Sequence, residues 1–338
     1  MKNKMTKIAV IGANENLGRE ILSILNENDI KADDIIALEP KAPMGTQVSY
    51  GEDEDLDVFN LNDFDLSKAD IALVALNTEL SKHVITQALN KGVKMIDCSG
   101  ATSADSDAPM IVAGLNNKML DEAKKNVVSI PSAVVTQILK PLSKVNEKYS
   151  LKRIVVNAYV STSFHSKEAM DELFGQTRKI YMNAPLVDDE EIFKKQIAFN
   201  VLPQVGSFIG EETDAEWRIN AEIKKVLGGN MKVHANLAYV PAFVGIGAFV
   251  NAEAALEIDL DDVRHLMQEQ KGVVVFDKQV DGGYVSLNDI QGENDIFVSR
   301  LRQDLSTLSG FSFWSVADNL RADMAQNAFE VMKLFLKK

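Results

Sequence analysis

Hydrophobic and polar positions in the first 130 residues follow two alternating patterns. Short apolar runs bounded by glycine or polar residues are typical of buried parallel strands. Runs with an apolar residue every three or four positions are typical of amphipathic helices. Because strands and helices alternate, we predict a parallel, doubly wound sheet. The predicted strands are residues 7–12, 34–38, 71–75, 93–97 and 127–130, and the predicted helices include 17–25 and 80–90.

The pattern changes beyond residue 152, where the strands become longer and alternate more clearly. This change predicts a largely antiparallel sheet with helices on one face. Residues 214–227 form an amphipathic pattern that ends at Gly228 and Gly229, a typical helix stop. The last predicted helix, residues 318–336, is expected to pack back onto the first domain, because one helix cannot stand alone. The predicted strands are 153–160, 233–240, 249–256, 296–301 and 311–316, and the acidic run 52–55 is predicted to be a solvated loop.

Composition and charge narrow the class of protein. The 338 residues include 49 acidic and 36 basic side chains, which gives a net charge of −13. This balance disfavours a nucleic-acid or anionic-membrane partner. We expect a soluble cytoplasmic protein, because no apolar run reaches the roughly 18 residues that span a bilayer and no signal peptide is recognisable. One cysteine and four scattered histidines argue against an internal disulfide and a structural metal site.

The first strand leads into a glycine-containing turn that resembles a dinucleotide-binding fingerprint only in part. Gly12 and Gly18 are in place, but Glu15 stands where backbone would have to approach a diphosphate closely. A carboxylate there adds bulk and like-charge repulsion. We therefore predict a turn that is kept for strand–helix packing, with the cofactor site lost. The alternative is that Gly12, Asn14 and Gly18 still contact a dinucleotide.

A second turn, residues 130–137, leads from a predicted strand into a predicted helix. Such a turn often carries a nucleophile in α/β enzymes, because the N–H groups at a helix N-terminus favour negative charge. The position expected to carry the nucleophile is Ala133, whose side chain has no reactive atom. The sequence thus predicts an enzyme fold that has lost its catalytic activity, because the nucleophile is missing.

Taken together, these segments resemble the aspartate-β-semialdehyde dehydrogenase family over nearly the whole chain. The most specific matches are residues 198–204, 295–304 and 316–321. The resemblance implies an N-terminal Rossmann domain, a central α+β domain for catalysis and dimerisation, and a returning C-terminal helix. We therefore expect a Rossmann-like domain of residues 1–131 with 318–338, a catalytic or dimerisation-type domain of residues 132–317, and a homodimer.

The family's reaction, as the resemblance implies it, is the reductive dephosphorylation of β-aspartyl phosphate with NADPH, or its reverse. A cysteine attacks the carbonyl carbon and forms a thioacyl intermediate, and a histidine carries the proton. An arginine and a glutamate hold the amino-acid end of the substrate, and an arginine and a lysine hold phosphate. Residues 39–41 stand where the family places residues that meet the 2′-phosphate of NADP.

Most of these groups are replaced in this chain. The resemblance places Ala133 at the cysteine and Ile246 at the histidine, Tyr239 at the substrate arginine, Phe164 at a substrate glutamine and Ser103 at the phosphate arginine, while residues 167–170 replace a segment that wraps the cofactor. Glu222, Lys225, Asn319 and Arg321 survive, although the glycine expected two positions after Arg321 is Asp323. For Glu222 and Lys225 we expect an ordinary i, i+3 ion pair on an exposed helix face.

Four other side chains are candidates to replace the reactive groups. Ser132 and Thr136 are hydroxyls without an identifiable base, which makes them poor nucleophiles. Cys98 is expected to be a small buried side chain. His165 adjoins Phe164 and is expected to be structural or solvated.

Three functions remain open at this point. The first is a non-catalytic paralogue that acts as a binding or scaffold homodimer, without a cofactor, and that could associate with an active paralogue. The motif of residues 313–319 resembles such degenerate relatives. The second is an active NADP-dependent aspartate-semialdehyde dehydrogenase of the lysine, threonine and methionine biosynthetic pathway. The third is a changed small-molecule site, made more apolar by Phe164, Tyr239 and Ile246.

Overall fold

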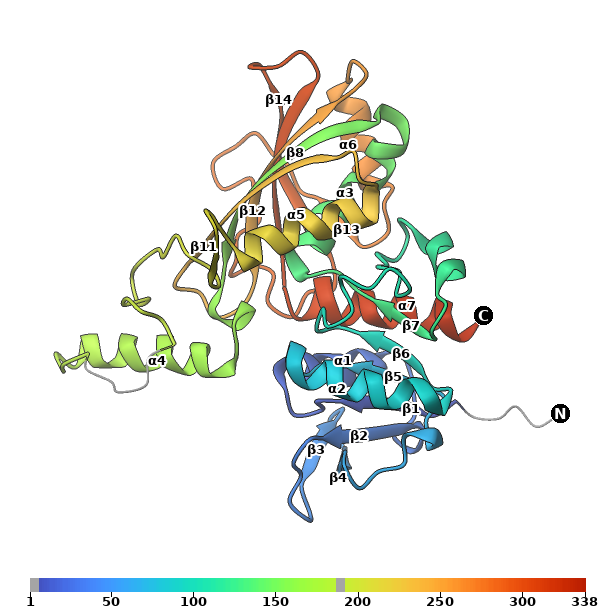
Figure 1. Ribbon diagram of the computed structural model, residues 1–338. Helices are drawn as coiled ribbons and strands as arrows, with labels where there is room; N and C mark the ends of the chain where they lie inside the picture. Colours follow the sequence, from blue (N-terminus) through green and yellow to red (C-terminus); the bar gives the residue numbers. More distant parts are fainter. Residues whose placement is uncertain (1–5, 187–191) are drawn as a thin grey trace. The chain divides into compact units, whose positions relative to one another are not determined.

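The computed structural model describes residues 6–186 and 192–338. The chain divides into two compact units, Met1–Ser132 with Met324–Lys338 and Ala133–Asp323 (Figure 1). The C-terminal segment therefore belongs to the first unit, as the sequence predicted. No helix in the described parts of the chain is long and apolar enough to cross a membrane.

The first unit is built on a seven-stranded sheet with the order β3-β4-β2-β1-β5-β6-β7. All neighbouring strands are parallel except β3, which runs antiparallel to β4. Short strands such as β1 are buried along their whole length, because helices cover both faces of a doubly wound sheet. The elements are β1 (Ile8–Ile11), α1 (Asn16–Glu27), β2 (Ile35–Glu39), β3 (Gln47–Tyr50), β4 (Glu54–Asn60), β5 (Ile71–Val74), α2 (Thr78–Ala88), β6 (Lys94–Asp97), β7 (Val127–Ser129) and α7 (Gln326–Leu336).

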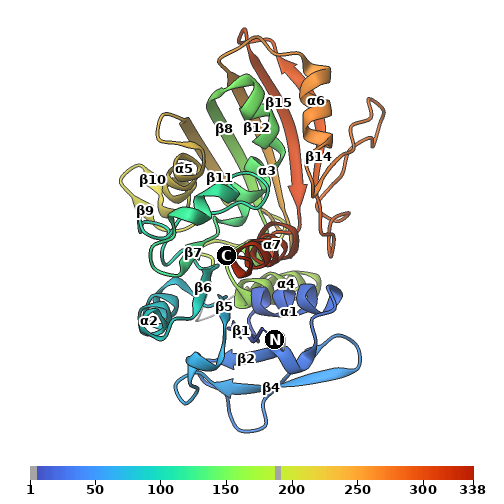
Figure 2. The ribbon, with the colours of Figure 1, turned by 90° about the vertical axis from the view of Figure 1, so that its right-hand side faces the viewer.

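Alternate residues of β1 point into the two cores of this unit. Ile8 and Val10 pack with the apolar side chains of α1 and α7, whereas Ala9 and Ile11 pack with those of α2. Helices α1 and α7 thus share one face of the sheet and α2 lies on the other (Figure 2). The predicted doubly wound sheet is confirmed.

Two sequence predictions in this unit need correction. Glu54 and Asp55, expected in a loop, begin the strand β4, which pairs with the edge strand β3 while Leu56 and Val58 fill the core. The predicted helix of residues 318–336 is not continuous. Arg321–Ala325 forms a π-helical turn before α7 begins at Gln326.

The second unit is built on a six-stranded sheet with the order β11-β8-β12-β15-β14-β13. Its three central pairs are antiparallel and its two outer pairs are parallel. Helices α3, α5 and α6 contact the strands. The elements are α3 (Ala133–Tyr149), β8 (Leu151–Val160), α4 (Lys167–Tyr181), β9 (Phe208–Ile209), β10 (Glu212–Thr213), α5 (Asp214–Leu227), β11 (Lys232–Tyr239), β12 (Ile246–Ala254), α6 (Leu260–Gln268), β13 (Val273–Val275), β14 (Ile296–Asp304) and β15 (Gly310–Ala317).

The two faces of this second sheet differ in burial. Along β8, Ile154, Val156 and Ala158 are buried, whereas Val155 and Tyr159 on the opposite face are only half-buried. This period of two is the signature of a strand with one covered face. The mixed α/β architecture with a second, largely antiparallel sheet is as predicted.

Candidate functional site

The fold brings Ala133 and Ile246 into one neighbourhood. Ala133 is the first residue of α3, and Gln137 lies one turn further on the same helix face. The side-chain Nε2 of Gln137 donates a hydrogen bond to the backbone oxygen of Ile246 at 3.2 Å. Ala133 is 5% exposed and Ile246 is fully buried. The two positions expected to carry a thiol and a proton carrier are therefore occupied by small or apolar buried side chains.

Tyr239, at the end of β11, is part of an aromatic cluster. Its ring meets Phe193 edge-on with 5.0 Å between centroids, and its backbone N–H and carbonyl both pair with Leu202. Desolvation by burial, reinforced by the negative charge of Asp214, raises the pKa of Tyr239 to about 12. Its hydroxyl is therefore neutral at physiological pH, so this position supplies no positive charge for a carboxylate.

Phe164 and His165 lie in the turn between β8 and α4. Phe164 is half-buried at the end of the short helical turn Thr162–Phe164. The His165 ring lies 6.3 Å from that of Phe193. Although its side chain is partly open to solvent, packing against neighbours lowers the pKa of His165, an effect that Glu168 and Glu172 oppose. His165 thus belongs to the same aromatic cluster as Tyr239.

Glu222 on α5 departs from the expectation of an exposed ion pair. It is 2% exposed, and its Oε1 accepts a hydrogen bond from Nε of Arg218 at 2.6 Å. The expected exposed helix face is therefore wrong for Glu222, because Ile219 and Ile223 on either side turn this face into the core. Lys225 is half-buried on the same helix.

Asn319 holds two turns of the second unit together. Its Oδ1 accepts hydrogen bonds from the backbone N–H of Gly245 at 2.8 Å and from the hydroxyl of Ser163 at 3.0 Å. These internal donors occupy the side-chain oxygen of Asn319.

Asp323 is the least expected group near this region. It is fully buried, and neither carboxyl oxygen has a hydrogen-bond partner in the described parts of the chain. Desolvation raises the pKa of Asp323 well above its usual range; the charge of Asp318 adds to this and that of Lys140 opposes it. The carboxyl that replaces the expected glycine is therefore held in an environment that favours its neutral form.

The surroundings of Cys98 and Thr136, as far as the structure describes them, do not activate either side chain as a nucleophile. Cys98 is buried, and desolvation together with the charge of Asp97 raises the pKa of its thiol. Thr136 Oγ1 is buried without a hydrogen-bond partner among the described residues, and Ser132 is 9% exposed. A thiol or hydroxyl without a base is a weak nucleophile.

Ser103 lies in a turn organised by a buried carboxylate. The two oxygens of Asp97, at the end of β6, accept hydrogen bonds from the backbone N–H and hydroxyl groups of Ser99 and Thr102 at 2.6–2.8 Å. Ser103 follows directly and is half-buried. The turn keeps its shape without an arginine for phosphate.

In the first unit, the glycines of the β1–α1 turn are required by packing. Gly12 has φ +90°, and an added Cβ would lie 3.0 Å from the oxygen of Ala75. An added Cβ at Gly18 would lie 1.9 Å from the oxygen of Gly12. Both glycines thus let α1 pack closely on β1 whether or not a nucleotide binds.

Two carboxylates stand where NADP would present phosphates, one in this turn and one at the end of β2. The backbone N–H of Asn14 donates to Oε1 of Glu39, at the end of β2, at 2.6 Å. Glu15 is exposed at the N-terminus of α1 and makes no side-chain cap. A diphosphate at that terminus and a 2′-phosphate near Glu39 would both meet negative charge. Glu39 therefore disfavours the 2′-phosphate of NADP, whereas Glu15 adds repulsion for the diphosphate of any dinucleotide.

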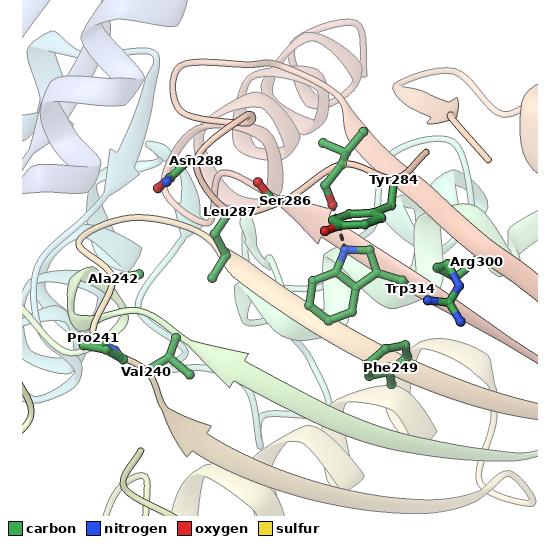
Figure 3. A pocket seen from close by; sticks show the side chains of 11 residues that line it. Val240, Pro241, Ala242, Phe249, Tyr284, Ser286, Leu287, Asn288, Arg300 and Trp314 are labelled. Atoms are coloured by element: carbon green, nitrogen blue, oxygen red, sulfur yellow. Dashed lines mark hydrogen bonds between the residues drawn. The ribbon is translucent and has the colours of Figure 1, made fainter. Parts of the chain in front are cut away.

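A pocket of the second unit lies elsewhere. It has a volume of about 590 Å³ and sits against Phe249 and Trp314, under the loop of residues 284–288 (Figure 3). The indole N–H of Trp314 donates to the oxygen of Val285 at 2.9 Å and anchors this loop. Ala133, Phe164, Tyr239 and Ile246 do not line the pocket, so it is not an enlarged version of the predicted site. In the described parts of the chain, no three acidic, histidine or cysteine side chains gather as metal ligands.

Comparisons with known proteins agree with this architecture. A family model described as "Semialdehyde dehydrogenase, NAD binding domain" matches residues 7–123, and one described as "Semialdehyde dehydrogenase, dimerisation domain" matches residues 139–322. The aspartate-semialdehyde dehydrogenase of Rickettsia bellii is 34% identical over 336 residues, which cover 99% of this chain and 98% of the relative.

Solved structures give the same result. Aspartate semialdehyde dehydrogenase II of Vibrio cholerae, complexed with ASA, has 28% identity, covers 99% of both chains and superposes with a TM-score of 0.93. A probable aspartate-semialdehyde dehydrogenase of Pseudomonas aeruginosa has 27% identity, the same coverage and a TM-score of 0.91.

Proposed function

Because the chain belongs to the aspartate-semialdehyde dehydrogenase family, we propose that it keeps the family fold as a non-catalytic binding or scaffold homodimer. The observation that carries the proposal is the pair Ala133 and Ile246. Covalent catalysis at a carbonyl needs a nucleophilic atom and a proton carrier within reach of each other. The positions joined through Gln137 supply neither.

Other replaced positions add to the proposal. Tyr239 and Ser103 stand at positions where the resemblance requires arginines, and neither side chain carries a positive charge. Glu222 and Asn319 survive, but their polar atoms engage Arg218, Gly245 and Ser163. One lost group could be compensated, whereas the joint loss of four removes attack, proton transfer and substrate charge recognition together.

An active NADP-dependent enzyme is the second candidate. It is favoured by relatives named aspartate-semialdehyde dehydrogenase, which match this chain along nearly their whole length. It would require a different nucleophile and a different proton carrier. The raised thiol pKa of Cys98 disfavours the nucleophilic thiolate.

The assay that separates these candidates is the phosphate-dependent reduction of NADP with aspartate semialdehyde, run with purified protein. We expect no turnover above the background without protein. A family member that carries both the cysteine and the histidine serves as the positive control. Turnover of about 1 per second or more, an ordinary enzymatic rate, would refute the loss of the reaction. The Ser132→Ala and Thr136→Val variants would then show whether either hydroxyl is responsible.

We also propose that two copies of the chain associate through the half-exposed face of the six-stranded sheet. The domain that matches the dimerisation model contains this sheet. Its half-exposed face carries Tyr159, Phe249 and Trp314. The ring centroid of Trp314 lies 4.9 Å from that of Phe249 and 6.4 Å from that of Tyr159. An apolar, partly open aromatic surface on a sheet suits burial against a second sheet. Light scattering that gives the mass of one chain at micromolar concentration would contradict this assignment.

A further inference from the structure

The topology of the first unit identifies one place where a ligand is expected to bind. The strand order runs outward from β1 to β2 and β4 on one side, and to β5, β6 and β7 on the other. The chain thus reverses its direction of winding between β1 and β5. Ligands of open parallel sheets bind outside the carboxyl ends of the strands at such a switch point. The side chains at these strand ends therefore decide what can bind.

Glu39 is an acidic side chain at this edge, next to the switch point. It is the last residue of β2, which pairs with β1 through Leu38 and Ile11. It is 8% exposed, so little of its side chain meets solvent. The backbone N–H of Asn14 fixes one carboxylate oxygen at 2.6 Å. The other oxygen, Oε2, makes no hydrogen bond within the described chain and remains available as an acceptor.

This arrangement orients the carboxylate before any ligand arrives. The neighbouring amides of Gly12 and Ala13 donate to the oxygen of Leu38, at 2.8 and 3.3 Å. The backbone around Glu39 and the turn is thus tied together, and Glu39 cannot swing away without breaking the bond from Asn14. A fixed carboxylate at the end of the second strand is a hydrogen-bond acceptor for a ribose hydroxyl and repels a phosphate at the same place.

The charged neighbours of Glu39 add net negative charge around its carboxyl group. Desolvation by burial raises the pKa of Glu39 and the amide of Asn14 lowers it; of the two charged neighbours, Glu15 acts more strongly than Arg19. Glu15 itself has an extended backbone with φ −66° and ψ 155°, so the turn does not need glycine at that position. The exposed carboxylate of Glu15 then adds negative charge beside the N-terminus of α1.

We propose that Glu39 makes the first unit selective for an adenine dinucleotide with a free ribose 2′-hydroxyl, such as NAD, over its 2′-phosphorylated counterpart NADP. The accepting group is Oε2 of Glu39, and the excluded group is the dianionic phosphate. This selectivity reverses what the resemblance to NADP-dependent enzymes implies. It concerns binding by the first unit and is independent of whether the chain catalyses any reaction.

The test is a pair of affinity comparisons by isothermal titration calorimetry on the full chain. NAD is compared with NADP, and 5′-AMP with adenosine 2′,5′-bisphosphate; each pair differs only in the 2′-phosphate. We expect the free 2′-hydroxyl to be preferred at least ten-fold, a difference of about 1.4 kcal/mol. In Glu39→Gln, which removes the charge but keeps an acceptor for Asn14, the preference should fall to within about three-fold.

Two further variants separate a local effect from net charge. Glu27→Gln makes the same charge change at the C-terminal end of α1, roughly 18 Å along the helix from its N-terminus. Glu27 accepts a hydrogen bond from Ser23 there. This variant should leave the preference unchanged. Glu15→Gln should tighten NAD and NADP alike, because both carry the diphosphate. Circular dichroism and the melting temperature establish that each variant is folded.

The wild-type chain provides a readout that needs no variant. Raising the salt concentration from about 20 to 500 mM screens repulsion, so the preference for NAD over NADP should shrink. The proposal is overturned if NADP binds the wild type as tightly as NAD, if Glu39→Gln keeps the full preference, or if neither dinucleotide binds wild type or Glu15→Gln at 10 mM (about the weakest binding of interest).

Discussion

The side-chain amide of Gln137 donates a hydrogen bond to the backbone oxygen of Ile246 at 3.2 Å and so joins the first turns of α3 to the start of β12. Ala133 lies one helical turn before Gln137, and Ile246 is fully buried. The junction between helix and sheet has been kept while the two side chains that would perform chemistry there are apolar. This relationship favours a structural role for the turn at Ala133.

The packing at Ile246 predicts that a proton carrier is no longer accommodated there. Ile246→His should destabilise the second unit by about 2–4 kcal/mol, since it removes core contacts and buries a polar ring. Urea unfolding followed by tryptophan fluorescence measures this, because both tryptophans, Trp217 and Trp314, lie in the second unit. Ile246→Val is the matched control, with an expected cost of about 0.5–1.5 kcal/mol. A histidine variant as stable as the wild type would indicate that the position still tolerates a polar catalytic group.

The buried Asp323 predicts an unusual pH dependence of stability. Its folded-state pKa is raised above the unfolded value of about 3.9. Its contribution to stability is therefore fully present below about pH 4 and is lost as the pH rises through the folded-state pKa. Asp323→Asn should raise the melting temperature at pH 7 by roughly 2–4 °C, the shift for about 1 kcal/mol in a unit of this size. At pH 4 the difference should vanish.

Asp289 offers a control of opposite sign for that experiment. The hydroxyl and backbone N–H of Ser286 lower the pKa of Asp289. Its contribution is thus present above its unfolded pKa and is lost as the pH falls. Asp289→Asn should lower stability at pH 7 and have a smaller effect at pH 3. Equal pH profiles for the two variants would contradict the assignment of a neutral buried carboxyl to Asp323.

The burial of Glu222 predicts that it matters for stability. Glu222→Ala should cost roughly 1–3 kcal/mol, because it removes a charged hydrogen bond from a buried position and leaves Arg218 without that acceptor. The exposed neighbour Lys224 is the control, and Lys224→Ala should stay within about 0.5 kcal/mol of the wild type. Denaturant unfolding gives both values. If Glu222→Ala leaves the free energy of unfolding unchanged, Glu222 would again be a candidate ligand-binding residue.

The proposed dimer face predicts a separable effect on assembly. Tyr159→Glu places a charge among the aromatic rings on the half-exposed side of β8, which should weaken a sheet-to-sheet interface at least ten-fold while the fold is kept. Sedimentation across a range of protein concentrations measures the association. Leu305→Glu, on an exposed turn after β14, is the control and should assemble like the wild type. If Tyr159→Glu associates as tightly as the wild type, the interface lies elsewhere.

Local patterns in the sequence were sufficient for the regular elements. The apolar run at residues 7–12 and the helical spacing at 214–227 correspond to β1 and α5, which has the predicted bounds and begins with a capping box between Thr213 and Glu216. These signals are local, since periodicity and caps depend on neighbours within one or two turns. Helix α4 and the strand β4, which carries Glu54, Asp55 and Asp57, were not predicted.

The sequence by itself also determined which reactive groups are absent, because Ala133 and Ile246 carry no thiol or imidazole in any conformation. Only the tertiary structure decided what the remaining polar groups do. Glu222 is paired with Arg218, Asn319 accepts from Gly245 and Ser163, and Glu39 is held by Asn14. Partners of this kind are mostly far apart along the chain, and a side chain's burial and charge environment depend on which strands and helices are brought together. For that reason a sequence motif such as Glu222 with Lys225 can survive unchanged while its polar atoms are engaged inside the fold.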